Sequence, residues 1–340
     1  MKTSTFIFRV DASEAIGLGH LSRCLFFASY IEAKGHNIVF LTKENLSKNI
    51  IELKGFKCQR FSKSIPNLKK LFNSFSVIAD INSNKVFEKK SDYNAHLDIL
   101  RENANSLITF EDMIDYPYCS DVVIIPYCGA QKIMLDSECN SRYLIGEDYF
   151  LLKPEFTTKS YAVSKRPKTI LITMGGSDPE KITLKVLNAI SNLNQIDEII
   201  VVIGKASNIS SSDIMKTIHN SKIKINVLNN LENISNVMLE CDIAITNSGL
   251  TKYELASLGV PSIIISNNKQ QAFYSDFFSS FKASIHLGYY NDINEKFIRD
   301  KCLELMQKYE LRVTMSNSGK KLIDGNGINR IWKAIKEKNL

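Results

Sequence analysis

Short runs of apolar, mostly β-branched residues alternate with stretches of helical periodicity along the 340-residue chain. In the first half these runs are Thr5–Val10, Asn37–Thr42, Ser76–Asp80, Leu107–Phe110 and Val122–Pro126. In the second half they are Thr169–Met174, Glu198–Ile203, Lys224–Leu228, Asp242–Thr246 and Ser262–Ser266. Strands joined by helices are typical of a parallel sheet, because its crossover connections place helices on both faces. The sequence therefore predicts two doubly wound α/β domains.

A polar segment separates the two series of strands. Residues 156–168 are polar and include several Lys and Ser residues, Arg166 and Pro167, a composition typical of a linker. We expect an N-terminal domain over residues 1–155, this linker over 156–168, and a second domain over 169–323. Gly325 and Gly327 predict a break before a last helix within 324–340, which is free to pack on either domain.

Composition excludes several classes of protein. No stretch reaches the ~18 apolar residues of a membrane span, and the N-terminus lacks the apolar region of a secretory signal, so we expect a cytoplasmic protein without a membrane span. The net charge of +7 is the difference between 43 basic and 36 acidic residues. The basic residues are spread along the chain, so we expect no nucleic-acid partner. The seven cysteines form no CxxC pair, which predicts neither a zinc site nor a disulfide framework.

A glycine-bearing loop follows the first strand. It reads Asp11-Ala-Ser-Glu-Ala-Ile-Gly17-Leu-Gly19-His20, and a helix is predicted to open at about His20. The two glycines allow a tight turn and a close approach of the backbone to a ligand. The positive end of a helix dipole disfavours an imidazolium ion and so favours the neutral ring that a general base requires. His20 is therefore the candidate catalytic base, with a histidine that only caps or packs as the alternative.

A second glycine loop, Met174-Gly-Gly-Ser177, follows the first strand of the second domain. Free backbone N–H groups at such a loop and helix start bind phosphate. Helix capping explains the same residues without a ligand. Either Asp178 is the N-cap with Pro179 at the first helical position, or Ser177 and Glu180 form a capping box.

A third loop follows the strand Asp242–Thr246. Ser248 and Gly249 can offer N–H groups to a pyrophosphate, and Glu254, one turn into the next helix, can accept the hydroxyl protons of a ribose. A capping box of Thr251 and Glu254 is the alternative.

Two phosphate-suited loops in one domain, without a GxxxxGK[ST] sequence, favour a diphosphate ligand over an NTPase. No Asp-x-Asp pair is present to hold a divalent cation, so we expect no metal and no cofactor, with helix dipoles and backbone N–H groups neutralising the leaving group. The GxSxG motif is absent, and no Ser or Cys lies beside a histidine in sequence, which leaves His20 as the base.

Together these segments resemble the UDP-sugar hydrolases of the pseudaminic acid pathway, a family that releases UDP from UDP-2,4-diacetamido-2,4,6-trideoxy-β-L-altropyranose. The matching segments, in order, are Arg9-x-Asp11…Ile16-Gly-x-Gly-His20…Arg23-Cys24, Gly146-Glu-Asp-Tyr149…Leu152-Lys-Pro154-Glu-Phe156, Met174-Gly-Gly-Ser-Asp-Pro179 with Thr183, and Ala244-Ile-Thr-x-Ser248-Gly-x-Thr251…Glu254-Leu-Ala…Gly259-Val-Pro261. They span most of the chain.

The resemblance implies a glycosyltransferase-B-like fold, with two Rossmann-like domains facing a cleft, in which His20 activates a water that attacks C1 of the sugar with inversion. The implied UDP-binding residues are Gly175, Gly176, Ser177, Asn247, Ser248, Gly249, Thr251 and Glu254. The implied sugar-side residues are Asp11, Gly17, Gly19, Arg23, Asn82, Gln270 and Gln271. A looser similarity to the transferase that adds N-acetylglucosamine in peptidoglycan synthesis supports the assignment of Glu254 to the ribose.

Two of these positions depart from the family pattern and leave the sugar open. The chain reads Asp80-Ile-Asn82 where a tyrosine is usual, and Gln270-Gln271 where Asn-Gln is usual. We therefore expect a monomeric UDP-sugar hydrolase of a nonulosonic acid or surface glycan pathway. The main alternative is a glycosyltransferase in which His20 deprotonates an acceptor hydroxyl. A third is a sensor that binds UDP-sugar without cleaving it.

Overall fold

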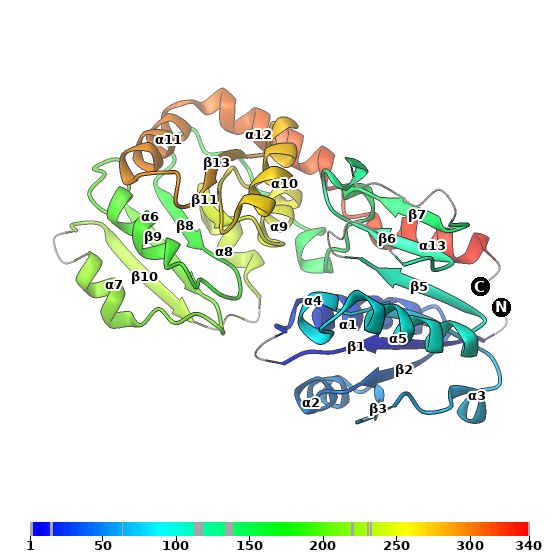
Figure 1. Cartoon of the computed structure of the whole chain (residues 1–340). Coiled ribbons are helices and arrows are strands. Elements are labelled where there is room, and N and C mark those ends of the chain that lie inside the picture. Colours follow the sequence, from blue (N-terminus) through cyan, green and yellow to red (C-terminus); the bar gives the residue numbers. More distant parts are fainter. Residues whose placement is uncertain are drawn as a thin grey trace. The chain divides into compact units, whose positions relative to one another are not determined.

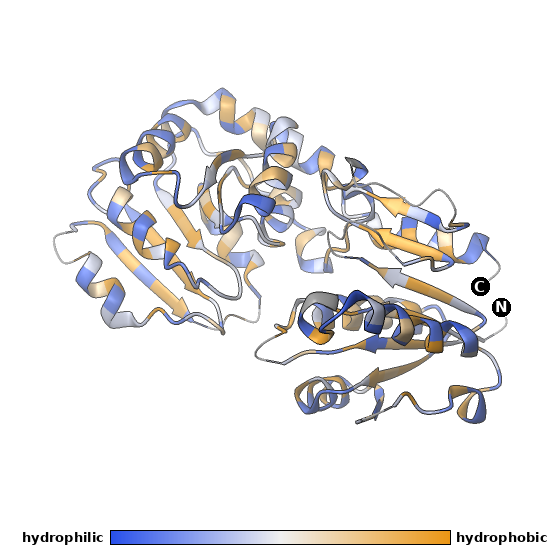
Figure 2. Ribbon diagram, in the orientation of Figure 1, coloured by the Kyte–Doolittle hydropathy of each residue, from blue (hydrophilic) through white to orange (hydrophobic). Residues whose placement is uncertain are grey.

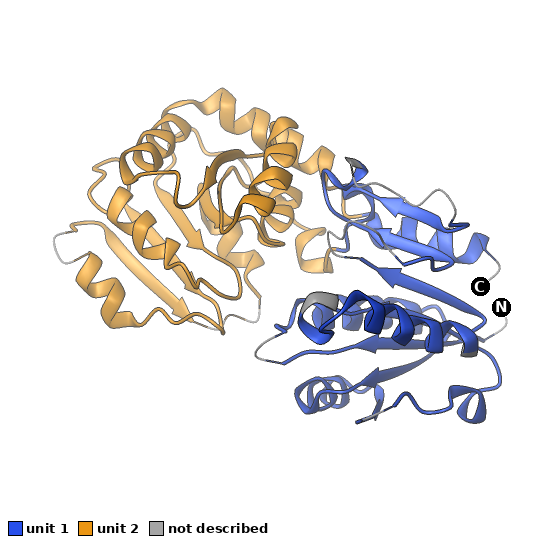
Figure 3. Cartoon of the chain, in the orientation of Figure 1, with its two compact units in different colours: residues 1–151, 326–340 blue, residues 152–325 orange. Residues whose placement is uncertain are grey.

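The computed structural model divides the chain into two compact units (Figure 3). It describes residues 3–13, 16–62, 64–111, 118–132, 139–218, 221–229, 231 and 233–338. Unit 1 contains residues 1–151 and 326–340, and unit 2 contains residues 152–325. The segment 156–168, expected as a linker, is part of unit 2, where Phe156 and Tyr161 are buried and the Tyr161 N–H donates to the Leu258 carbonyl.

In the described part of unit 1, seven parallel strands form one sheet in the order β3-β2-β1-β4-β5-β6-β7 (Figure 1). The strands are β1 (Thr5–Val10), β2 (Asn37–Thr42), β3 (Lys57–Arg60), β4 (Phe75–Asp80), β5 (Ser106–Phe110), β6 (Val122–Ile125) and β7 (Arg142–Ile145). The helices are α1 (Gly19–Glu32), α2 (Asn45–Leu53), α3 (Leu68–Leu71), α4 (Ser83–Val86), α5 (Lys90–Asn103) and α13 (Gly327–Glu337), with short 3-10 turns at Ala130–Lys132 and Glu147–Tyr149.

Alternate residues of β1 bury the two faces of this sheet. Phe6 and Phe8 pack in one cluster with side chains of α1, α2 and α13, whereas Ile7 packs in another with side chains of α3 and α5. Most strands of this sheet are accordingly coloured as apolar in Figure 2. Helices on both faces make this a doubly wound sheet, as the sequence predicts.

In the described part of unit 2, six parallel strands form a second sheet in the order β10-β9-β8-β11-β12-β13. The strands are β8 (Thr169–Thr173), β9 (Glu198–Ile203), β10 (Lys224–Asn229), β11 (Ile243–Asn247), β12 (Ser262–Ser266) and β13 (Ile285–Tyr289). The helices are α6 (Ile182–Ile190), α7 (Ser211–Thr217), α8 (Ser235–Glu240), α9 (Thr251–Leu258), α10 (Lys269–Ser280), α11 (Glu295–Gln307) and α12 (Tyr309–Leu322), with a 3-10 turn at Pro154–Phe156.

The strand order reverses once in each sheet. The reversal lies between β1 and β4 in unit 1 and between β8 and β11 in unit 2. In open α/β sheets a ligand binds beyond the carboxyl ends of the strands at this point, because the following loops diverge to opposite faces there. The fold therefore selects the loops after β1 and β4 in one unit, and after β8 and β11 in the other.

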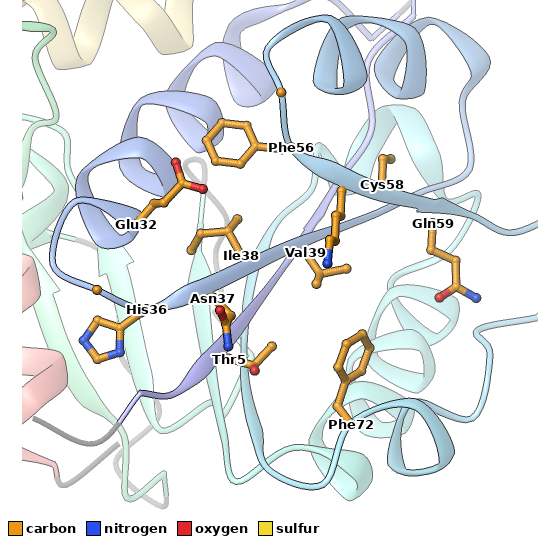
Figure 4. Close-up of a pocket in the computed structure, with 13 residues that line it drawn as sticks. Thr5, Glu32, His36, Asn37, Ile38, Val39, Phe56, Cys58, Gln59 and Phe72 are labelled. Carbon is orange, nitrogen blue, oxygen red and sulfur yellow. The ribbon is translucent and has the colours of Figure 1, made fainter.

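Three further features complete the description. Cys119 and Cys139 form a disulfide, a pairing that the scattered cysteines did not predict. The described helices include none that is long and apolar enough to cross a membrane. Unit 1 has a hollow of about 690 Å³ that is lined by Thr5, Asn37 and Lys57, the first residues of β1, β2 and β3 (Figure 4). The hollow lies at the amino ends of these strands, whereas His20 follows the carboxyl end of β1, so the hollow is not the predicted site.

Candidate active site

His20 lies at the switch point of unit 1. Helix α1 begins at Gly19, so His20 is in its first turn, as predicted. Gly17 has a backbone φ of 89°, which only glycine adopts readily, and this turn directs the chain into the helix. Asp80 is the last residue of β4 and pairs in register with Val10 at the end of β1. The fold thus brings His20 and Asp80 together across 60 residues of sequence.

His20 and Asp80 form a close pair. The Nδ1 atom of His20 is 2.6 Å from Oδ1 of Asp80, the distance of a charge-assisted hydrogen bond. Asp80 is fully buried, which alone would raise its pKa, but the charges and hydrogen bonds of Arg23 and His20 outweigh burial and hold that pKa well below its usual range. An ionised carboxylate only accepts hydrogen bonds, so Nδ1 carries the proton and Nε2 is the basic nitrogen of the neutral ring.

Arg23 balances the charge of this pair. Its Nε and Nη2 atoms donate to the two oxygens of Asp80, both at 2.7 Å, and its Nη1 donates to the Tyr127 hydroxyl at 2.8 Å. The guanidinium also lies over the ring of Phe110. Because Arg23 neutralises Asp80, the cluster carries no net charge when His20 is neutral. Arg23, expected to contact the sugar, thus directs its guanidinium to protein partners.

Asp11 is likewise engaged inside the protein. Its carboxylate accepts from Arg9 Nη2 at 2.6 Å, from the Thr42 hydroxyl at 2.9 Å and from the Lys43 backbone N–H at 2.7 Å. Burial alone would raise the pKa of Asp11, but Arg9 and these hydrogen bonds lower it overall. Asp11 is only 2% exposed, so its role in this structure is to anchor the loop before His20.

Arg9 itself connects to a second histidine. Its Nε donates to His96 Nε2 at 3.0 Å, and burial together with the charges of Arg9 and Lys43 lowers the pKa of His96 to about 3. His96 is therefore neutral at physiological pH and serves as a hydrogen-bond acceptor. Asn82, another expected sugar contact, is half-buried. Its backbone carbonyl accepts from the backbone N–H groups of Lys85 and Val86 in α4.

The two glycine loops of unit 2 are joined by the side chain of Asn247. Its Nδ2 donates to the Met174 carbonyl at 2.5 Å, and its Oδ1 accepts from the Gly249 N–H at 3.0 Å. Gly175 has a φ of 73° and packs against this side chain. The predicted phosphate-binding residues Gly175, Gly176, Ser177, Ser248 and Gly249 therefore belong to two loops held together at the switch point.

The loop after β9 packs on the same place, which sequence reasoning missed. A side chain at Gly204 would come within 2.2 Å of the Gly175 carbonyl oxygen, so this position requires glycine. The Ala206 N–H donates to the Gly176 carbonyl at 2.9 Å. The sequence feature that could have indicated this contact is Gly204, which directly follows the predicted strand Glu198–Ile203.

The start of α6 differs from the expectation. The helix begins at Ile182, not at Pro179, and no capping box forms at Ser177 and Glu180. Instead the carboxylate of Asp178 accepts from the backbone N–H groups of Ile182 and Thr183 at 2.8 and 2.9 Å. These N–H groups are occupied by Asp178, whereas the loop backbone at Gly176 and Ser177 is exposed.

Helix α9 lacks the predicted capping box. Its N-cap is Leu250, without a side-chain cap, and Thr251 is its first residue. In the described part of the chain the Glu254 carboxylate has no hydrogen-bond partner. Burial raises the pKa of Glu254 to about 7, partly offset by Lys153. An acidic side chain without a cap role, held at a helix start beside a glycine loop, fits a ligand contact.

Gln270 and Gln271 lie in the first turn of α10, after β12. Gln270 is exposed, and the Gln271 N–H donates to Asn268, the N-cap. The Oε1 atom of Gln271 is buried and has no hydrogen-bond partner among the described residues. A buried amide oxygen without a hydrogen-bond partner, just after the carboxyl end of β12, is compatible with the expected sugar contact. The described ranges contain no group of three or more His, Cys, Asp or Glu suited to hold a metal ion.

Comparisons with known proteins support the predicted fold, and one family model matches most of unit 2. Residues 169–324 match the model of the glycosyltransferase family 28 C-terminal domain. The structure is similar to the crystal structure of Acinetobacter baumannii MurG, with a TM-score of 0.68 and 12% identity over 98% of this chain and 99% of that one. The chain thus has a glycosyltransferase-B-like fold, built from two parallel-sheet α/β domains.

Two curated relatives are more similar in sequence. The uncharacterized protein MJ1062 of Methanocaldococcus jannaschii is 29% identical over 311 residues, which is 85% of this chain and 60% of that protein. The spore coat polysaccharide biosynthesis protein SpsG of Bacillus subtilis is 27% identical over 222 residues, 64% of this chain and 65% of that protein. The matched regions span less than two thirds of either relative.

Proposed function

We propose that the protein hydrolyses a UDP-linked diacetamido-trideoxy sugar to UDP and the free sugar, in the biosynthesis of a nonulosonic acid or another surface glycan. The observation that carries this proposal is the His20–Asp80 pair, which leaves Nε2 of a neutral imidazole as a base at the switch point of unit 1. The family match of unit 2, the name of the SpsG relative and the resemblance of the motifs support a nucleotide-sugar substrate.

The chemistry assigned to each unit follows from its residues. In unit 1, His20 Nε2 takes a proton from water, and the oxygen attacks C1 of the sugar as the C1–O bond to the diphosphate breaks, which inverts the configuration. Asp80 holds the Nδ1–H tautomer and stabilises the imidazolium that forms. In unit 2, the N–H groups of the loops joined by Asn247 stabilise the departing diphosphate, and Glu254 binds the ribose.

A glycosyltransferase is the second candidate, because residues 169–324 match the model of the glycosyltransferase family 28 C-terminal domain. The same His20 would then deprotonate an acceptor hydroxyl. The two candidates differ in whether water alone suffices.

UDP release from a panel of UDP-linked diacetamido-trideoxy sugars, with no acceptor added and with EDTA present, tests the proposal. We expect steady, multiple-turnover release of UDP that chelation does not reduce. No release until an acceptor alcohol is supplied would replace the hydrolase with the transferase. Activity lost in EDTA and restored by magnesium would overturn the metal-independent mechanism. Binding of UDP-sugars without cleavage under any condition would indicate a sensor.

A further inference from the structure

Four polar side chains of unit 2 form a continuous hydrogen-bond chain. The Ser248 hydroxyl, in the loop after β11, is bonded to the hydroxyl of Ser266, the last residue of β12. Ser266 Oγ is 2.8 Å from Nε2 of His286 on β13, and Nδ1 of the same imidazole is 2.6 Å from Oδ1 of Asp276 on α10. The chain crosses three neighbouring strands and ends in the loop assigned to the diphosphate.

Burial differs sharply along this chain. Ser266 and Ser248 are 0% and 6% exposed, and the His286 side chain is 2% exposed, whereas Asp276 is 74% exposed. The chain therefore connects a carboxylate in solvent with a buried hydroxyl at the ligand loop. The order Ser–His–Asp is that of a nucleophilic triad. However, Ser266 is fully buried and its hydroxyl is bonded to Ser248, which leaves it no access to a substrate carbonyl.

The charge of His286 sets the direction of the two hydrogen bonds that involve Ser266. When the ring is neutral, Nδ1–H donates to Asp276 and Nε2 accepts the Ser266 proton, so Ser266 accepts from Ser248 and Ser248 presents a lone pair to the loop. When the ring is protonated, Nε2–H donates to Ser266, Ser266 donates to Ser248, and the Ser248 proton points away from Ser266. Only the second arrangement offers a donor to an anion.

We propose that binding of the nucleotide diphosphate at Ser248 is coupled to the uptake of one proton by His286, through reversal of the two serine hydroxyls. The inference rests on the proposed function, because it takes UDP as the ligand of this loop. The balance is one proton from solvent onto Nε2, with the Ser266 proton turning to Ser248 Oγ and the Ser248 proton turning to an oxygen of the diphosphate. His286 is a positioning residue in this scheme, since Ser248 makes the contact.

The surroundings of His286 suit this role. The described elements that pack most extensively against β13 are β12, which has no titratable side chain, and α10, whose titratable residues are Lys269, Tyr274 and Asp276. Of these, Asp276 contacts the imidazole. A cation of α9 also contacts α10: the Lys252 ammonium lies 3.2 Å from the Ser275 hydroxyl. An imidazole can carry a proton on both nitrogens at once, and each nitrogen of His286 has a partner here, Asp276 at Nδ1 and Ser266 at Nε2.

Calorimetric titration with UDP at pH 7.5, in buffers of different ionisation enthalpy, counts the protons taken up on binding. We expect the wild-type count to exceed that of His286→Gln and of Ser266→Ala by ~0.5–1 proton per UDP, because both variants break the linkage. Protons contributed by UDP itself cancel in this difference. Uridine, which lacks phosphate, should give the same count in all three proteins. His36→Gln, a histidine of unit 1, is the matched control and should behave as wild type.

Affinity measurements separate this inference from the proposed function. Failure of the wild-type protein to bind UDP would refute the proposed function itself. Binding of UDP with equal proton counts in wild type and both variants would overturn only the coupling. Asp276→Asn alters an exposed side chain and so leaves the fold intact. It should weaken UDP about tenfold and leave uridine unchanged, as expected for a hydrogen bond to a charged group. Equal weakening of both ligands would show a structural role and overturn the inference.

Discussion

The switch points of the two units have the same topology but opposite chemistry. In unit 1, ionisable side chains converge after β1 and β4, where Asp80 holds both His20 and Arg23. In unit 2, glycines and small amides converge after β8 and β11, where the side chain of Asn247 joins two backbone loops. One position in a doubly wound sheet can therefore be built to move protons with side chains or to bind anions with backbone N–H groups.

The difference teaches how the two activities can be separated experimentally. Charged side chains in unit 1 should govern the rate of the reaction, and the loops of unit 2 should govern nucleotide affinity. A variant of unit 1 that changes only nucleotide affinity, or a variant of a unit 2 loop that changes only the rate, would contradict this division.

The largest effect is expected for Asp80→Asn. The change leaves Arg23 and His20 around a neutral amide, and removal of one partner of a buried ion pair costs roughly 3–5 kcal/mol of unfolding free energy. The asparagine NH₂ group can also donate to Nδ1, which moves the ring proton to Nε2 and removes the base, so the rate should fall on the order of 10⁴-fold. Chemical denaturation and UDP-release kinetics measure both.

Asp148→Asn is the matched control, because Asp148 of unit 1 is 72% exposed. It should change neither stability nor rate. Full activity in Asp80→Asn would mean that His20 does not depend on its carboxylate partner.

His20→Asn should reduce the rate by ~10²–10⁴ and leave both the fold and the affinity for UDP unchanged, because the base acts only in the chemical step. Stopped-time assays of UDP release and calorimetry with UDP separate the two quantities. His36→Asn, the other histidine near α1, should behave as wild type. Loss of UDP affinity in parallel with the rate would identify His20 as a structural residue instead.

Glu254→Ala should weaken UDP by about 1–3 kcal/mol through the lost ribose hydrogen bonds, while the rate at saturating substrate stays close to wild type. Glu240→Ala, an exposed glutamate of α8, controls for loss of charge. Unchanged UDP affinity in Glu254→Ala would remove this residue from the binding site and weaken the assignment of unit 2.

The smallest effect concerns pH. Burial raises the pKa of Glu254 to about 7, and the ribose hydroxyls require its ionised form, so uridine affinity should rise with pH by about tenfold between pH 6 and 8. The same raised pKa contributes stability that is fully present below the ordinary value of 4.5 and is lost as pH rises through 7. A pH-independent affinity for uridine, measured by titration in wild type and in Glu254→Ala, would contradict this contact.

The fold was predictable where strands are central and apolar. The missed strands β3, β7 and β13 are edge strands, in which most residues are only partly buried and residues such as Lys57, Arg142 and His286 replace the apolar pattern. These segments become strands because they pair with an adjacent strand of the sheet, and the local sequence alone does not indicate that pairing.

The candidate site was predictable in its loops but not in its partners. The rule that ligands lie after strand ends identified the loops that contain His20, Gly175 and Ser248. The pairing of His20 with Asp80 could not be found, because it depends on β4 lying beside β1. The start of α6 was misplaced for a similar reason, since the Asp178 carboxylate satisfies N–H groups four and five residues later.

Helix α13 bears on the order in which the protein is made. Its side chains Ile331, Trp332 and Ile335 fill the same core as Phe6 and Phe8 of β1, yet all of unit 2 is translated between them. Unit 2 is continuous in sequence and can fold as soon as its last helix leaves the ribosome. Unit 1, although it is begun first, must wait until α13 has been translated before its apolar face is covered. Synthesis of α13, rather than synthesis of the sheet, is therefore the event that completes the half of the protein that carries His20.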